Sequence, residues 1–464
     1  MRRRTTTRRT SVVAGALALG LSLAACGGGG SGGSSGTTVD YWMWDASQVP
    51  GYQRCADAFE RANPGTRIRI TQYGWDDYWS KITAGFIADT APDVFVNHVS
   101  KFPQFTDLDV LRPLDELGPT RTITDAEFQP GLGQLWKGQD GKRYGAPKDW
   151  DTVAVFYDKR KVAAAGITPQ QLSTMTWNPT DGGSFQRIVS RLTVDERGRR
   201  GDQAGFDKSR VRTYGFASGG GGGDNWGQTQ WSPFTGSTGW QPLDQNPWGR
   251  TFRFDEPGVQ RTIEWYFGLN RKGFMPSYRE IGGSEGTSVD KQVQTGQAAM
   301  AISGSWMLGT FTSLTDAQGK KLDIGIAPTP VGPNGRRASM FNGIADSITR
   351  SSDSPQTSAQ WVKFLSGDAC QQIIGRSGVV FPARPAGTQA AIDYNRTERG
   401  IDVSPFTDQV RDRTTFLFPM TSNSADVTAL MQPQLDAIYI GSEKVSSLTG
   451  LNRQLDDLLA LAAK

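Results

Sequence analysis

Residues 39–96 decide the fold, and they read VDYWMWDASQVPGYQRCADAFERANPGTRIRITQYGWDDYWSKITAGFIADTAPDVFV. Short β-branched or apolar runs alternate here with segments of helical spacing. The expected elements are a strand over 39–43, a helix over 52–62, a strand over 67–72, a helix over 77–88 and a strand over 92–96. This alternation predicts a doubly wound α/β unit with a parallel sheet.

A second set of α/β segments follows. Strands are expected over 152–157, 214–217, 298–302 and 322–327, and helices over 158–165, 288–294, 358–365 and 369–375. The stretch 178–212 is polar and rich in Gly and Arg, so we expect a long surface excursion there. The chain is long enough for two lobes, each with a core of its own.

The bulk composition is that of a globular protein, with 37% hydrophobic and 21% charged residues. Five of the 50 basic residues lie in the first nine positions, which leaves 45 basic against 46 acidic residues. No basic surface remains to indicate nucleic acid. The 14 tryptophans and 56 glycines favour a polar ligand with flat apolar faces, such as a sugar.

His98 is the only histidine of the chain. A site with several histidine ligands is therefore excluded, and Ser-His-Asp catalysis would depend on this residue alone. We expect no metal, no cofactor and no catalytic residue.

The N-terminus predicts export and a lipid anchor. A basic start precedes an apolar segment that is too short to span a bilayer. Leu-Ala-Ala-Cys at 23–26 resembles the lipobox of bacterial lipoproteins, which implies cleavage before Cys26 and a diacylglyceryl thioether on its sulfur. We expect a signal peptide over 1–25, a Gly/Ser linker over 26–36 and an extracytoplasmic protein anchored to the cell membrane. The export route, general or twin-arginine, stays open, and a plain secreted protein is the alternative.

Four stretches resemble segments of the extracellular solute-binding proteins of carbohydrate ABC importers, the maltose-binding protein group. They are PDVF at 92–95, YGAP at 144–147 with VFYDK at 155–159, TGQAAMAISGSW at 295–306, and WVKFL at 361–365 with GVVFPAR at 378–384. They occur in order over essentially the whole chain after the signal.

The resemblance implies a type II periplasmic-binding-protein-like fold, in which two doubly wound α/β lobes are joined by a three-segment hinge. The crossings are expected near Pro147, near 341–345 and near Phe381. Lobe 1 would then comprise 37–147 and 342–380, and lobe 2 would comprise 148–341 and 381–464.

The resemblance also implies the function. Such a protein captures a sugar or oligosaccharide between its lobes and delivers it to the permease subunits of an ABC importer, without chemical change. We expect a monomer that binds no nucleic acid and contacts the membrane through its lipid. Two alternatives remain: an extracellular glycoside hydrolase, since acids and Trp-rich clefts also serve hydrolysis, and a binding protein for a non-sugar solute.

The expected ligand-binding residues lie at the carboxyl ends of strands, where ligands bind in α/β sheets, at the crossings near Pro147 and 341–345 that the resemblance implies, and after the glycine loop over 219–223. They are Trp44, Asp45, Asn97, His98, Lys101, Trp150, Asp151, Asn225, Trp226, Ser305, Trp306, Asn342 and Gly343. Carboxylates and amides would bind sugar hydroxyls, and tryptophan faces would stack on sugar rings.

Several of these residues also have a purely structural interpretation. Trp306 could be part of the core, Asp151 a solvated hinge acid and His98 a structural histidine. Trp42 and Trp44 share one face of their strand, and Trp44 is the favoured platform of the two.

Two further cysteines are expected to pair. By the resemblance, the helices that carry Cys55 and Cys370 both belong to the first lobe. Outside the cytoplasm such a pair is oxidised if the geometry allows it, so we expect a Cys55–Cys370 disulfide.

Overall fold

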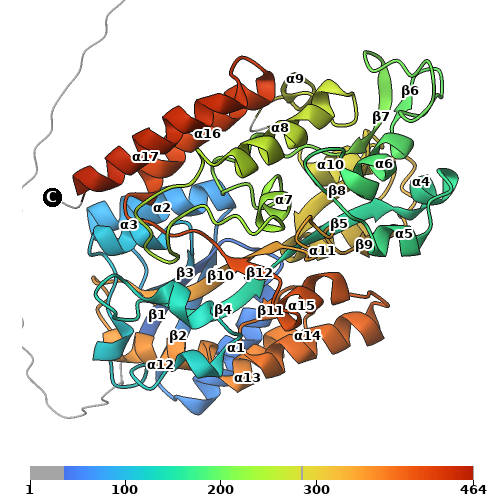
Figure 1. Ribbon diagram of the computed structural model, residues 1–464. Helices are drawn as coiled ribbons and strands as arrows, with labels where there is room; N and C mark the ends of the chain where they lie inside the picture. The colour runs from blue at the N-terminus through green and yellow to red at the C-terminus, as the bar shows by residue number, and fades with distance from the viewer. Residues whose placement is uncertain (1–35, 284–285, 463–464) are drawn as a thin grey trace, which may run out of the picture. The chain divides into compact units, whose positions relative to one another are not determined.

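The computed structural model describes residues 36–283 and 286–462. Its strands form one sheet of seven strands and one of five (Figure 1). The predicted signal peptide, the lipid site at Cys26 and all but the last residue of the linker lie outside the described residues. None of the helices in the described part is both long and apolar enough to cross a membrane.

The expected alternation of strands and helices at the start of the chain is confirmed. The elements are β1 Thr37–Met43, α1 Val49–Ala62, β2 Thr66–Gln72, α2 Trp75–Ala88 and β3 Val94–His98. β1 pairs in parallel with both β2 and β3, so the carboxyl ends of the three strands meet at one edge. Tyr41 and Met43 are buried, whereas Trp42 and Trp44 are partly exposed on the other face.

Later strands complete this first sheet. Its order is β11-β4-β10-β3-β1-β2, and β12 also pairs with β10. These additional strands are β4 Ala146–Asp151, β10 Ser339–Ile348, β11 Phe381–Pro382 and β12 Thr415–Leu417. β10 runs antiparallel between β3 and β4, and its register places Asn342 opposite Asp151.

The second sheet has the order β6-β7-β8-β5-β9. Its strands are β5 Val153–Asp158, β6 Val194–Asp195, β7 Val211–Phe216, β8 Ala298–Gly304 and β9 Ile324–Ala327. The expectation of a surface excursion over 178–212 is wrong for 183–192, where helix α6 Gly183–Leu192 lies with Phe185, Val189 and Leu192 buried, whereas most residues over 196–210 are exposed. These apolar residues recur at helical spacing, a signal that the many Gly and Arg residues obscure.

The chain changes sheet at identifiable points. β4 belongs to the first sheet and β5 to the second, so the first change falls at Thr152, later than the expected crossing at Pro147. The second falls between β9 and β10, before residue 341, and β11 with Phe381 remains in the first sheet. The lobe boundaries themselves stay a prediction, since strand pairing does not assign the helices to lobes.

The remaining helices pack around the two sheets and on one another (Figure 1). They are α3 Phe102–Asp107, α4 Lys159–Ala164, α5 Pro169–Ser173, α7 Ser232–Gly236, α8 Pro257–Arg271, α9 Tyr278–Ile281, α10 Val289–Gln294, α11 Leu308–Ser313, α12 Pro355–Leu365, α13 Asp368–Gly375, α14 Pro385–Glu398, α15 Ser404–Arg411, α16 Ser424–Ile440 and α17 Leu448–Ala462. Short 3-10 turns lie at Leu114–Glu116, Asp125–Glu127, Leu132–Trp136, Ser305–Met307 and Val445–Ser447. α12 and α13 pack with α1 beside the first sheet, and α6 packs on β7.

A disulfide joins α1 to α13. Cys55 and Cys370 are both fully buried, and their Cα atoms lie 5.3 Å apart. The bond links the start of the first sheet to a segment 315 residues later in the chain. This is the pairing that the resemblance implies.

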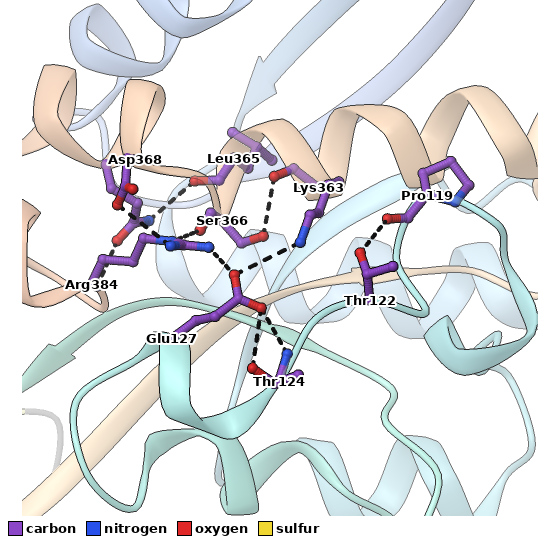
Figure 2. A network of polar contacts seen from close by, with 10 residues as sticks. Pro119, Thr122, Thr124, Glu127, Lys363, Leu365, Ser366, Asp368 and Arg384 are labelled. Carbon is purple, nitrogen blue, oxygen red and sulfur yellow. Dashed lines mark hydrogen bonds and ion pairs between the residues drawn. The ribbon is translucent and has the colours of Figure 1, made fainter.

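A polar network ties the same part of the molecule together (Figure 2). The carboxylate of Glu127 accepts a 2.8 Å hydrogen bond from the backbone N–H of Thr124 and pairs with Arg384. Lys363 Nζ lies 3.8 Å from the same carboxylate, and Arg384 Nε donates to the carbonyl of Ser366. The network joins the turn at 125–127, the α12–α13 connection and the chain after β11.

Candidate ligand-binding site

Aromatic rings gather where β1 and β3 end. The ring centroid of Trp44 lies 5.1 Å from that of Trp75 and 5.2 Å from that of Tyr78. The centroids of Trp79 and His98 follow at 5.4 and 6.2 Å. Trp44 is therefore surrounded by rings, whereas Trp75 is 44% exposed. We call these five residues the aromatic wall.

His98 joins the aromatic wall to a row of polar side chains. Its Nε2 lies 2.9 Å from Asn342 Nδ2 on β10, and its Nδ1 lies 2.8 Å from Ser100 Oγ. Burial lowers the pKa of the His98 imidazole to about 3, and the charge of Lys101 acts in the same direction. The ring is therefore neutral at physiological pH and serves as a hydrogen-bonding group.

Asp151 continues this row. Its Oδ1 accepts a 2.9 Å hydrogen bond from Gln228 Nε2, and the residue is 7% exposed. Burial raises the pKa of the Asp151 carboxyl well above its usual range, the charge of Asp149 raises it further, and hydrogen bonds from Gln228 and Asn342 lower it in part. We call His98, Asn342, Asp151 and Gln228 the polar strip. A ligand hydroxyl that donates to the carboxylate would relieve its poor solvation.

A buried ion pair lies on β4, the strand that also carries Asp151. Lys148 Nζ is 2.6 Å from Asp149 Oδ2, and Lys148 also donates to Gln48 Oε1. Gln48 in turn donates to Asp45 Oδ2 at 2.9 Å. Asp45 thus lies at the end of a fixed hydrogen-bonded chain. Among the described residues, no group of three or more His, Cys, Asp or Glu side chains could hold a metal ion.

Asn97 and Lys101 flank His98 in different environments. Asn97 is fully buried, and its Nδ2 donates to Ser347 Oγ at 3.2 Å. Lys101 is partly exposed, with its Nζ 6.0 Å from the ring centroid of Trp79. Burial lowers the pKa of the Lys101 ammonium, and Asp224 opposes this shift. The structure therefore places Lys101 beside the aromatic wall and Asn97 inside the sheet.

Trp306 follows β8 on the second sheet. The backbone N–H of Ser305 donates to the carbonyl of Thr152 at 3.0 Å, which places the end of β8 next to Asp151. A Cβ on Gly304 would lie 1.7 Å from a ring carbon of Trp306, so only glycine lets the indole lie against the strand. Trp306 is 37% exposed, which argues against the alternative of a core residue.

Three other expected residues pack on apolar or aromatic side chains instead. Trp150 is 2% exposed and stacks on Phe381 at 4.9 Å, and Gly343 is buried against Leu135. Trp226 is 6% exposed and stacks on Phe252 at 5.9 Å. Asn225 is half-buried in the preceding loop.

Sequence reasoning missed Trp75 and Gln228. Trp75 begins the helix after β2, so the strand-end rule that selects Trp44 and His98 also selects Trp75 at the end of the second strand. Gln228 carries no comparable signal, because its partner Asp151 is 77 residues away and belongs to another element.

The comparison with known families identifies the class of this chain. The family of bacterial extracellular solute-binding proteins matches residues 54–394, and the chain belongs to this family. The expected family resemblance is thereby confirmed, and with it a site of action outside the cytoplasm. The two-sheet α/β architecture is the type II periplasmic-binding-protein-like fold of its structural neighbours.

Individual relatives agree with this assignment. The maltodextrin-binding protein MdxE of Bacillus subtilis is 23% identical over 373 residues, covering 76% of this chain and 75% of that protein. UspC of M. tuberculosis has a TM-score of 0.69 and 24% identity over 91% of this chain and 100% of its own. The ABC substrate-binding protein Lmo0181 of Listeria monocytogenes, solved in complex with cycloalternan, has a TM-score of 0.72 and 15% identity over 92% and 99%. At these identities the solved structures show a shared fold.

Proposed function

We propose that the protein captures a sugar or oligosaccharide between its two sheet units and delivers it to the permease subunits of an ABC importer. One observation carries the proposal: the aromatic wall adjoins the polar strip, whose members come from β3, β4, β10 and a loop after the second-sheet strand β7. Sugars combine flat apolar faces with many hydroxyl groups, and this arrangement matches both features.

The charges near the polar strip favour a neutral ligand. Lys148 is buried and paired with Asp149, so it has no free charge to offer an anion. Lys101 is the remaining cation beside the strip that sequence reasoning singled out, and burial lowers its pKa. Asp151 and Asn342 instead supply acceptors and donors for hydroxyl groups.

Closure on the ligand is part of this proposal. Gln228 lies on the second-sheet side and His98 on the first, and Asp151 and Asn342 connect them. A ligand that contacts both sides only in the closed state would shift the equilibrium toward closure. The hinge near Pro147, 341–345 and Phe381, and the lobe ranges given above, belong to the proposal.

The proposal includes the cellular setting. The mature chain would begin at the lipid-bearing Cys26, and the linker over 26–36 would act as a flexible tether to the membrane. The protein would work as a monomer and would release its ligand unchanged.

A ligand screen tests the function. We expect at least one sugar of a carbohydrate library to raise the melting temperature of the mature protein, because a ligand at roughly 100-fold excess over its Kd stabilises by about 2.7 kcal/mol. The same sugar, isotopically labelled, should be recovered intact after incubation. Cleaved product would favour the hydrolase, and stabilisation only by charged or non-sugar solutes would favour the third alternative.

A further inference from the structure

Trp75 is the outermost ring of the aromatic wall. It and Trp306 are the two most exposed tryptophans in the described part of the chain, at 44% and 37%. The Trp75 ring meets those of Trp44, Trp79 and His98 at 5.1 to 5.5 Å, with interplanar angles between 81° and 89°. These contacts hold the indole in one orientation and leave much of its surface to solvent.

The neighbouring Trp44 has less surface to offer. It contacts Trp75, Tyr78, Trp79 and His98, and these rings occupy its surroundings. A sugar that approaches the aromatic wall from solvent would therefore meet Trp75 first. An immobilised, half-exposed indole beside hydrogen-bonding groups is suited to stacking on a sugar ring.

Trp75 lies near His98 of the polar strip, whereas Trp306 lies near Asp151. Trp75 adjoins His98, with ring centroids 5.5 Å apart. Trp306 follows Ser305, whose N–H bonds the residue after Asp151. Asn342, 3% exposed, bonds His98 and lies opposite Asp151, 7% exposed, so a ligand that touches both indoles would span the length of this row.

We propose that Trp75 stacks on a second sugar ring while Trp306 stacks on the first, so that the ligand is a disaccharide or a longer oligosaccharide. This inference rests on the proposed function and deepens it. Trp75 would thereby help to select the length of the ligand. Neither the fold nor the place of Trp75 in helix α2 requires such a role.

Calorimetric titration of two sugar series tests the inference. We would titrate glucose, maltose and maltotriose, and then mannose, mannobiose and mannotriose, into the mature wild-type protein and its variants. In the series that binds, we expect the disaccharide to bind at least about tenfold more tightly than the monosaccharide. Trp75→Ala should remove this advantage, so that the disaccharide loses at least about tenfold more affinity than the monosaccharide does.

Two further variants separate stacking from packing. Trp75→Phe keeps a flat ring and should retain part of the advantage, whereas Trp75→Met fills similar space without a flat face and should lose it. Ile87→Ala is the matched control, because Ile87 is 85% exposed on the same helix. Melting curves of each variant report whether the fold is retained.

The outcomes separate the assignment of Trp75 to a second sugar ring from the sugar-binding function itself. If Trp75→Met keeps the full disaccharide advantage, or if both sugars weaken equally in Trp75→Phe and Trp75→Met, the second-ring assignment is overturned while the sugar-binding function stands. A wild-type protein that binds the monosaccharide as tightly as the disaccharide also overturns it. If the wild-type protein binds neither series nor any other sugar, the proposed function fails, and the inference fails with it.

Discussion

Trp306 lies against the end of β8 because Gly304, two residues before it, leaves room for the indole. We expect Trp306→Ala to weaken sugar binding by about tenfold or more, equivalent to about 1.4 kcal/mol, because the flat stacking surface is lost. The melting temperature should change little. Calorimetry with the sugar found in the screen measures the affinity, and Ile440→Ala, another exposed apolar residue, is the control. A variant that melts early but binds normally would show that Trp306 is structural.

Asp346 provides a pH test of the first sheet. It is 1% exposed on β10, and its Oδ1 accepts a 2.7 Å hydrogen bond from the Tyr41 hydroxyl. Burial raises the pKa of this carboxyl to about 7; Asp149 adds to the rise, while Lys148 and the Tyr41 hydrogen bond oppose it. The unfolded chain has a pKa of about 3.9, so the folded state binds the proton more tightly. Protonation of Asp346 therefore stabilises the fold fully below about pH 4, and this stabilisation is lost as the pH rises through about 7.

Asp346→Asn removes this titration. The variant should gain about 1–4 kcal/mol over the wild type at pH 8, with little difference at pH 4. Urea unfolding at several pH values measures the free energy of unfolding of both proteins. If the two curves run parallel from pH 4 to 8, Asp346 does not titrate in this range.

At the residue scale, the rule that ligands bind at the carboxyl ends of strands finds residues that meet in the structure where side chains lie near the end of their own strand. It selected Trp44 and His98, while the crossings implied by the resemblance selected Asp151 and Asn342, and these four residues lie next to one another in the site. Neither criterion separated these residues from Trp150, which is as buried as Asn342 but packs on Phe381, because packing partners come from distant elements. The indole N–H of Trp150 donates to the hydroxyl of Thr388, 238 residues later, and no local sequence pattern predicts that contact.

At the scale of elements, the α1–α13 disulfide is the strongest single constraint. We expect the Cys55→Ala/Cys370→Ala double variant to lose about 2–5 kcal/mol of the free energy of unfolding, because the unfolded chain is no longer cross-linked. Denaturant unfolding measures the loss, and reduced wild-type protein is the control for the cavity that alanine leaves. Two free thiols in the unreduced, denatured mature protein would contradict the pairing.

The elements that the sequence predicts most accurately are those whose apolar residues recur at a regular spacing. β1 to β3 with α1 and α2 lie where expected because each has a single dominant apolar pattern. The region around Trp226 could not be predicted, since its core consists of loop aromatics. There Trp226 stacks on Phe252, and Trp240 packs on Phe254 at 5.4 Å, without a recurring spacing.

At the scale of the whole molecule, the proposed function predicts a change of shape. Small-angle scattering of the mature protein should give a smaller radius of gyration with saturating sugar than without it, because the ligand favours the closed state. Trp306→Ala at the same sugar concentration should change less. An unchanged radius at saturation would show that binding occurs without closure.

The position of β10 between β3 and β4 has a consequence for the folding of the protein during its synthesis. A nascent chain that ends before residue 339 has β3 and β4 but lacks the strand that pairs with both. Their open edges cannot be satisfied by local neighbours, so the sheet must wait for late synthesis or late translocation. We expect the emerging polypeptide to remain a client of chaperones during this interval, and its exposed strand edges to be the segments that need protection from aggregation.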